Sequence, residues 1–204
     1  MPPPDPILQR KLLWAGEHWI NYLRPAGADI DSAQLSLYHS SYSPAGEGNV
    51  AFVIIPDVLE AVCTDNRDLM EFVLTTMIRG KNASLDRELA VFDAAFRRGG
   101  DVWQTPSWRI ELPEHLLEIS WSKLGKPVMV YRSDRTIQQR RPAFTLLFFA
   151  QKGEIRWDGS SLPGSPYSRD IWREVIGGDV RSSCVLALGE TMIQPPDKSS
   201  HWRG

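Results

Sequence analysis

The chain has 204 residues, of which 42% are apolar and 24% are charged, close to the averages of globular proteins. These proportions exclude a wholly disordered chain, a collagen-like fibre and a small disulfide framework. The 23 basic and 25 acidic side chains nearly cancel, so any attraction of nucleic acid or anionic lipid has to be local.

The length and the distribution of apolar residues predict a single domain over residues 7–194. Residues 1–6 include four prolines, which predicts a flexible N-terminal segment. Residues 195–204 are expected to form an irregular C-terminal tail. The longest apolar stretches, 50–55 and 144–150, are much shorter than the roughly 20 residues that cross a bilayer, so no membrane span is predicted.

The two cysteines indicate the compartment in which the protein is expected. Cys63 and Cys184 lie far apart in the chain, and the first 30 residues do not have the pattern of a secretion signal. We therefore expect a cytoplasmic, reducing setting in which both thiols are free. A single disulfide bridge between them is the alternative.

The first half of the chain is predicted to combine helices with two strands. Apolar residues recur at helical spacing over 8–24, which predicts an amphipathic helix. Alternation predicts a half-buried strand over 33–40, and a turn at 43–48 leads to a buried strand over 50–55. Asp57 and Glu60 resemble a helix N-cap pair, and two further helices are expected over 65–80 and 84–98.

The second half is predicted to be mainly strands. Alternating apolar residues occur over 108–112, 117–121 and 128–130, and a mostly apolar strand is expected over 144–150. Lys152 and Gly153 then predict a hairpin turn before a return strand at 154–158. A short helix over 168–176 and a buried strand over 184–188 complete the pattern. The expected fold is therefore α+β, with a mixed, mostly antiparallel sheet and helices packed on one face.

Few residues suggest catalysis. His39 extends the apolar face of its predicted strand, where it is either a general base or ligand, or a hydrogen-bonded core histidine. His115 is near Glu118, which could orient the imidazole if this stretch makes a helical turn; a surface cluster is the alternative. Neither the zinc pattern H-E-x-x-H nor a C-x-x-C pair is present, so no metal and no cofactor is expected.

Two features suggest a binding partner. Residues 123–141 form a predicted basic loop with a net charge of +5. It contains one acidic residue, Asp134, and six basic residues: Lys123, Lys126, Arg132, Arg135, Arg140 and Arg141. The loop indicates either a polyanion site or a solvated surface whose arginines pair with nearby carboxylates. On the predicted first helix, Trp14 lies on the polar side, which suggests either an exposed partner contact or a helix buried all round.

These observations favour a non-enzymatic interaction or accessory protein that binds a protein or polyanionic partner through the basic loop and an exposed Trp14. Self-association is one form of this prediction. The competing prediction is an enzyme or small-ligand-binding protein whose pocket is built around His39 or around His115 and Glu118.

Overall fold

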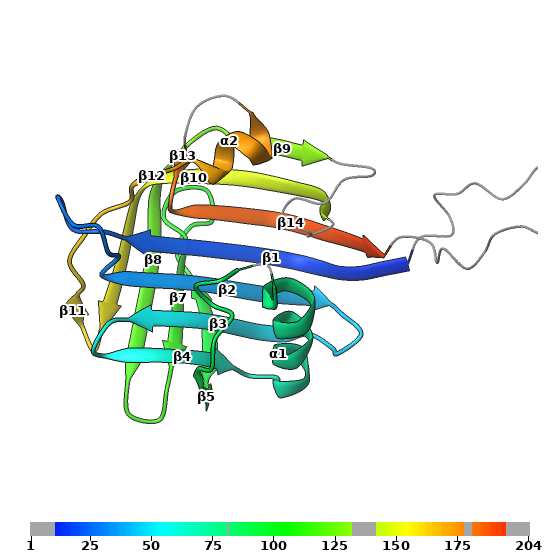
Figure 1. Cartoon of the computed structure of the whole chain (residues 1–204), viewed down its shortest axis with the longest axis horizontal. Helices are drawn as coiled ribbons and strands as arrows, with labels where there is room; N and C mark the ends of the chain where they lie inside the picture. Colours follow the sequence, from blue (N-terminus) through cyan, green and yellow to red (C-terminus); the bar gives the residue numbers. More distant parts are fainter. Residues whose placement is uncertain (1–10, 81, 132–141, 178–180, 195–204) are drawn as a thin grey trace, which may run out of the picture.

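The computed structural model describes residues 11–80, 82–131, 142–177 and 181–194. Strands make up 57% of these residues and helices 10%. The expected α+β fold is therefore wrong: the protein is mostly β, and its main sheet nearly closes into a barrel-like shape (Figure 1). None of the described helices is long and apolar enough to cross a bilayer.

Almost all of the described elements are strands. The larger strands are β1 (Lys11–Leu23), β2 (Ala33–Tyr42), β3 (Gly48–Ile55), β4 (Leu59–Thr64), β5 (Ala90–Asp93), β6 (Ala95–Gly99), β7 (Ser107–Glu111), β8 (Leu116–Leu124), β9 (Val128–Tyr131), β10 (Pro142–Trp157) and β14 (Val185–Gln194). Three strands have two residues each: β11 (Ser160–Ser161), β12 (Ser168–Arg169) and β13 (Arg181–Ser182). The helical segments are α1 (Arg67–Val73), the π-helical η2 (Leu74–Ile78) and α2 (Ile171–Ile176).

The main sheet turns two corners, and this is what nearly closes it. Its strands follow the order β5-β4-β3-β2-β1-β14-β10-β8-β7-β6. The first part of β10 pairs with β14 and β9, and the part from Ala150 onward pairs with β8. Strand β5 pairs with β4, and β6 pairs with β7 after the single residue Ala94, so this stretch also passes from one half of the sheet to the other. The two halves run crosswise over a shared interior, as in orthogonal sheet packing (Figure 1).

Three tryptophans fill much of that interior. The ring centroid of Trp19 lies 5.9 Å from that of Trp108 and 5.2 Å from that of Trp121. The indole Nε1 of Trp121 donates a 2.8 Å hydrogen bond to the carbonyl of Ile20, and the amide of Asn21 donates to the carbonyl of Ser120 at 3.1 Å. These bonds connect β1 to β8 in the opposite half of the sheet, so the two halves are held by directional contacts as well as by apolar burial.

The outer face of the first half is also covered. The α1–η2 segment packs on the outward side chains of β2, β3 and β4, with Leu69, Val73 and Met77 buried there. Helix α2 packs on the outward side chains of β1, β10 and β14 through Trp172 and Val175. The central strands are consequently buried on both faces, as strands of a fully covered sheet are.

This two-sided burial explains why the helix expected over 8–24 is the strand β1. Trp19 and Leu23 face the interior, whereas Ile20 and Tyr22 face outward under α2. Because both faces are apolar, the period of two is obscured and a helical spacing appears by coincidence. Trp14 is fully buried against the α1–η2 segment, so the expectation of an exposed Trp14 is wrong.

Two other expected helices are also absent from the fold. The stretch over 84–98 includes β5 and β6, whose backbone pairs with β4 and β7, so tertiary pairing overrides a helical pattern. Asp57 has a φ of 61° in the turn between β3 and β4 and does not cap a helix, and Glu60 lies within β4.

The hairpin turn expected at Lys152 and Gly153 is wrong as well, because β10 continues through both residues. Gly153 marks a close approach: a Cβ there would lie 2.6 Å from Asn21 Oδ1 and 2.7 Å from Cys184 Sγ. The glycine thus lets β10 pass over the buried Asn21 where the strand changes partner.

Several predictions of local structure are confirmed. The strands expected over 33–40, 50–55, 108–112, 117–121 and 128–130 are present as β2, β3, β7, β8 and β9. The helix expected over 65–80 is α1 followed by η2, and Asn66 caps it by accepting from the backbone N–H of Leu69 at 3.0 Å. The short helix expected over 168–176 is confirmed in part, as α2, because Ser168 and Arg169 form β12. Both cysteines are free and buried, and burial raises the pKa of each thiol to about 12.

The burial of Trp14 leads to a first prediction. Replacing Trp14 by alanine removes a fully buried indole, so we expect the free energy of unfolding in urea to fall by about 3–5 kcal/mol. Trp103, whose side chain is 66% exposed, serves as the control, and Trp103→Ala should cost much less. Equal losses for the two variants would contradict the burial of Trp14.

Candidate functional site

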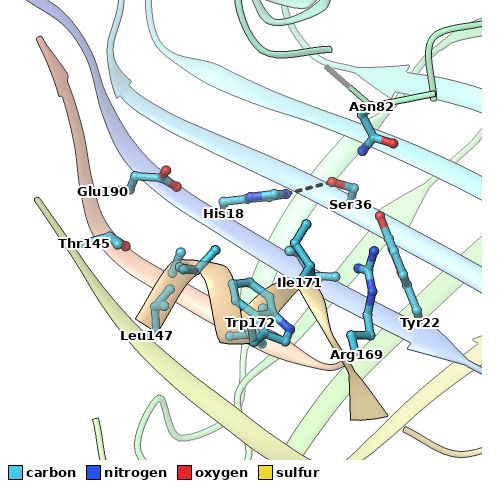
Figure 2. A pocket seen from close by; sticks show the side chains of 14 residues that line it. His18, Tyr22, Ser36, Asn82, Thr145, Leu147, Arg169, Ile171, Trp172 and Glu190 are labelled. Carbon is cyan, nitrogen blue, oxygen red and sulfur yellow. Dashed lines mark hydrogen bonds between the residues drawn. The ribbon is translucent and has the colours of Figure 1, made fainter. Parts of the chain in front are cut away.

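A cavity of about 160 Å³ lies on the outer face of the sheet, between the Asn82 end of the α1–η2 segment and helix α2 (Figure 2). Its floor is formed by β1, β2, β10 and β14, and α2 forms one wall. The lining residues are His18, Ile20, Tyr22, Ser36, Asn82, Thr145, Leu147, Arg169, Ile171, Trp172, Val175, Val185, Ala187 and Glu190. Most of this surface is apolar, with a few polar groups at separate places, which is the usual composition of a small-molecule site.

The polar side of the floor is a row of three side chains on neighbouring strands. His18 Nε2 and Ser36 Oγ are 2.7 Å apart and share a buried hydrogen bond. The imidazole of His18 is stacked on the ring of Tyr38, with centroids 4.0 Å apart and planes inclined by 11°. Figure 2 shows Glu190, from β14, on the side of the imidazole away from Ser36. His18, Ser36 and Glu190 are each less than a tenth exposed, so this row is largely shielded from water.

Two buried polar atoms in the cavity wall lack a partner among the described residues. They are Oγ1 of Thr145, on β10, and the indole Nε1 of Trp172, on α2. Both side chains are at least nine-tenths buried. A buried donor or acceptor that makes no hydrogen bond costs about 1–3 kcal/mol, so these atoms reduce the stability of the fold. The indole Nε1 atoms of Trp14 and Trp108, outside the cavity, also lack a described partner, so it is their position in the wall that makes the Thr145 and Trp172 atoms available to a bound molecule.

Arg169 brings a positive charge to the opposite end of the cavity from Glu190 (Figure 2). Its guanidinium carbon lies 5.0 Å from the centre of the Tyr22 ring, in a cation–π contact. The side chain is half-buried, and Arg169 is the second residue of the short strand β12, which precedes α2. The cavity therefore has an acidic end, a basic end and an apolar middle.

His39 occupies a different place from this cavity. It borders an open polar cleft at the end of β2, formed with Ser40, Ser41, Glu47, Gly48, Asp65 and Asn66. Asn49 Nδ2 donates to Asp65 Oδ2 at 2.6 Å, so Asn49 Oδ1 faces His39 and accepts a 2.9 Å hydrogen bond from its Nδ1. A catalytic or ligand-binding role of His39 stays a prediction.

His115 and Glu118 do not pair. His115 Nδ1 lies 2.7 Å from Asp158 Oδ2. Glu118 instead forms an ion pair with Arg109 on the neighbouring strand β7, with 3.7 Å between Glu118 Oε1 and Arg109 Nε. Asp158 also accepts a hydrogen bond from the backbone N–H of Leu116, and these two contacts hold its pKa below the usual value. The side chains of His115 and Asp158 are both exposed to solvent, and a catalytic role of His115 and Glu118 stays a prediction.

The residues predicted to bind a partner are only partly visible. Lys123 and Lys126 are exposed at the end of β8 and just after it, as a polyanion site requires. Arg132, Arg135, Arg140 and Arg141 lie outside the described residues. The basic loop therefore stays a prediction, whereas the burial of Trp14 removes its ring from any exposed contact surface.

Sequence reasoning missed the cavity because its residues come from six separate elements. The helix predicted over 8–24 concealed the floor of the cavity, because residues 11–23 form the strand β1. If 11–23 is interpreted as a strand, His18, Ile20 and Tyr22 alternate on one face, and this is the signal that could have found the floor. No local pattern links Ser36, Thr145, Arg169, Trp172 and Glu190, which only the fold brings together.

Comparisons with known proteins assign no function to these groups. No protein-family model matches the chain, and neither a curated protein nor a solved structure is significantly similar to it. Within the described part of the chain, no three His, Cys, Asp or Glu residues are grouped as metal ligands. The chemistry of the cavity is therefore inferred from its own geometry: it can enclose an apolar group and offer hydrogen bonds at its two ends.

The unpartnered hydroxyl of Thr145 leads to a second prediction. Thr145→Val keeps the shape of the side chain and removes a buried hydroxyl that has no partner among the described residues, so we expect the free energy of unfolding to rise by about 1 kcal/mol. Thr64→Val is the matched control. The buried Thr64 hydroxyl donates to the Asn49 carbonyl at 2.9 Å, and its loss should lower the free energy of unfolding by about 1–3 kcal/mol. Urea unfolding measures both values, and a loss of stability in Thr145→Val would show that its hydroxyl is satisfied.

Proposed function

We propose that the protein binds a small organic molecule in the cavity between α2 and the outer face of the sheet. The observation that supports this most directly is the cavity itself, a mostly apolar space of about 160 Å³ whose lining includes two unpartnered buried polar atoms, Thr145 Oγ1 and Trp172 Nε1. An apolar cavity kept only for packing would be more stable with valine and phenylalanine at these positions. Retention of polar groups at a cost in stability is typical of binding sites.

The size of the cavity limits the ligand. A cavity of about 150 Å³ is sufficient to bind benzene, and this one measures about 160 Å³. The ligand should therefore have a compact apolar body of about the size of one aromatic ring. Ile20, Leu147, Val185 and Ala187 form the apolar surface on which this body would lie.

The bond between His18 and Ser36 favours a second candidate, a hydrolase with Ser36 as the nucleophile and His18 as the base. The location of Ser36 argues against this function. It lies in the middle of β2 with β1 and β3 on either side, opposite Ile20 and Phe52, so the surrounding backbone N–H groups are used in sheet hydrogen bonds. A hydrolase needs free donors of that kind to stabilise the oxyanion. Binding, with His18 and Ser36 as polar contacts, is therefore the better supported function.

The polyanion-binding function that the sequence suggests remains a separate prediction. Its described residues, Lys123 and Lys126, are not among those that line the cavity. The two functions can therefore be tested independently of each other.

A cavity-filling variant tests the proposed function. We expect the full chain to bind benzyl alcohol, with changes in the NMR signals of the Ile20, Leu147 and Val185 methyl groups. Ala187→Leu places extra volume in the cavity and should abolish these changes, while circular dichroism remains that of the parent protein. Ile171→Phe fills the cavity from the α2 wall and provides a second variant, should Ala187→Leu disturb the sheet.

Ala26→Leu, in an exposed turn, is the matched control and should leave binding intact. If benzyl alcohol, benzylamine and benzoate all fail to change the methyl signals, the proposed function is wrong. Unchanged binding in both folded cavity-filling variants would show that the ligand binds elsewhere.

A further inference from the structure

We propose that the ligand of this cavity carries a single carboxylate on its compact apolar body and that Arg169 binds the carboxylate. This inference rests on the proposed function and adds the chemical class of the ligand. It is based on the charge at each end of the cavity, the direction of the polar groups and the available volume.

The first step concerns the partners of Arg169. None of the ion pairs formed within the described parts of the chain includes Arg169, although its neighbours have carboxylate partners: Arg24 is 2.8 Å from Asp31, and Arg173 is 3.6 Å from Asp170. An anionic group on the ligand would supply the charge partner that Arg169 does not have among the described residues.

The nearby buried carboxylate of Asp31 is already occupied. It accepts hydrogen bonds from Arg24 Nε, Gln34 Nε2 and Tyr167 Oη, each at 2.8 Å. Burial and the hydrogen bond to Asp31 raise the pKa of Tyr167 to about 12, so its hydroxyl remains a donor to Asp31 at neutral pH. Asp31 is thus held by three donors, and Arg169 remains directed into the cavity.

The second step concerns the geometry around the guanidinium. In Figure 2 the Arg169 side chain extends between Ile171 and Tyr22, and the indole nitrogen of Trp172 is on the side of its ring that faces Arg169. The Tyr22 ring supports the guanidinium at 5.0 Å and restricts its rotation. A planar guanidinium binds a carboxylate through two parallel hydrogen bonds. The unpartnered Trp172 Nε1 supplies a further donor beside it.

The third step excludes a second negative charge on the ligand. Glu190 lies at the other end of the cavity and is 6% exposed. Arg169 is the only arginine or lysine among the described residues that line the cavity, so a second carboxylate at the Glu190 end would find no second cation to bind. The cavity is therefore suited to a monocarboxylate, and its apolar middle to an aromatic or branched body.

Binding of matched ring compounds tests this inference. Benzoate, benzyl alcohol and benzylamine have the same ring and differ in the charge of one substituent, and terephthalate adds a second carboxylate. We expect the full chain to bind benzoate at least about tenfold more tightly than benzyl alcohol, as judged by calorimetry, because a charge-assisted bidentate contact is added. Benzylamine and terephthalate should bind more weakly than benzoate.

Two substitutions assign the preference to Arg169. Arg169→Gln should remove most of the ratio between the benzoate and benzyl alcohol affinities, and Arg169→Lys should retain part of it because the charge remains. Arg173→Gln is the matched control: Arg173 is exposed, lies four residues further along on α2 and does not line the cavity, so the ratio should not change.

Each outcome has a definite consequence. If benzyl alcohol binds in the cavity and benzoate binds no more tightly, the carboxylate inference is wrong and the proposed function stands. A benzoate preference that persists in Arg169→Gln would also overturn the role of Arg169. If none of the ring compounds binds, the proposed function fails and this inference fails with it.

Discussion

The structure depends on the burial of both faces of its central strands. β1 and β14 lie in the middle of the main sheet, with apolar side chains pointing both inward and outward. The inward side chains are covered when the sheet turns at β10 and at β5–β6 and folds over a shared interior. The outward side chains are covered by segments outside the sheet, and in the described part of the chain these are the short helical segments α1, η2 and α2. Because hydrophobic burial is the largest favourable term in folding, the placement of these segments determines the outer surface.

The cavity results from the limited length of that cover. α1 and η2 cover β2 to β4, the six-residue α2 covers β1, β10 and β14, and the cavity lies between Asn82 and α2. His18 and Ser36 are exposed to this space, and so are the apolar side chains of Ile20 and Val185. Other ways of closing such a gap exist, such as larger side chains at Ala187. The small side chain at this position and the polar atoms around it support the proposal that the cavity binds a ligand.

The polar groups of the cavity show how stability is balanced against binding. Thr145 and Trp172 each leave a buried polar atom without a protein partner, whereas Thr64, equally buried, has its hydroxyl fully bonded. Arg169 and Arg24 differ in the same way: Arg24 forms an ion pair with Asp31, whereas Arg169 forms none with the described residues. Two core tryptophans outside the cavity, Trp14 and Trp108, also have an indole N–H without a described partner, so Thr145 and Trp172 support a ligand site through their position in its lining. Proteins generally depart from local consistency at functional sites.

The sequence by itself determined the local features that depend on neighbouring residues. The turn at 43–48, the strands β2, β3, β7, β8 and β9, and the α1 helix capped by Asn66 follow from alternation, glycine content and capping chemistry. Only the tertiary structure decided that 11–23 is a strand, that 90–99 pairs with β4 and β7, and that β10 passes straight through Gly153. In these segments the stabilising contacts are with residues distant in the chain, so local spacing contains little of the information. The cavity has the same origin: His18, Ser36, Arg169 and Glu190 come together because β14 returns beside β1 at the end of the chain, and no spacing along the sequence records that contact.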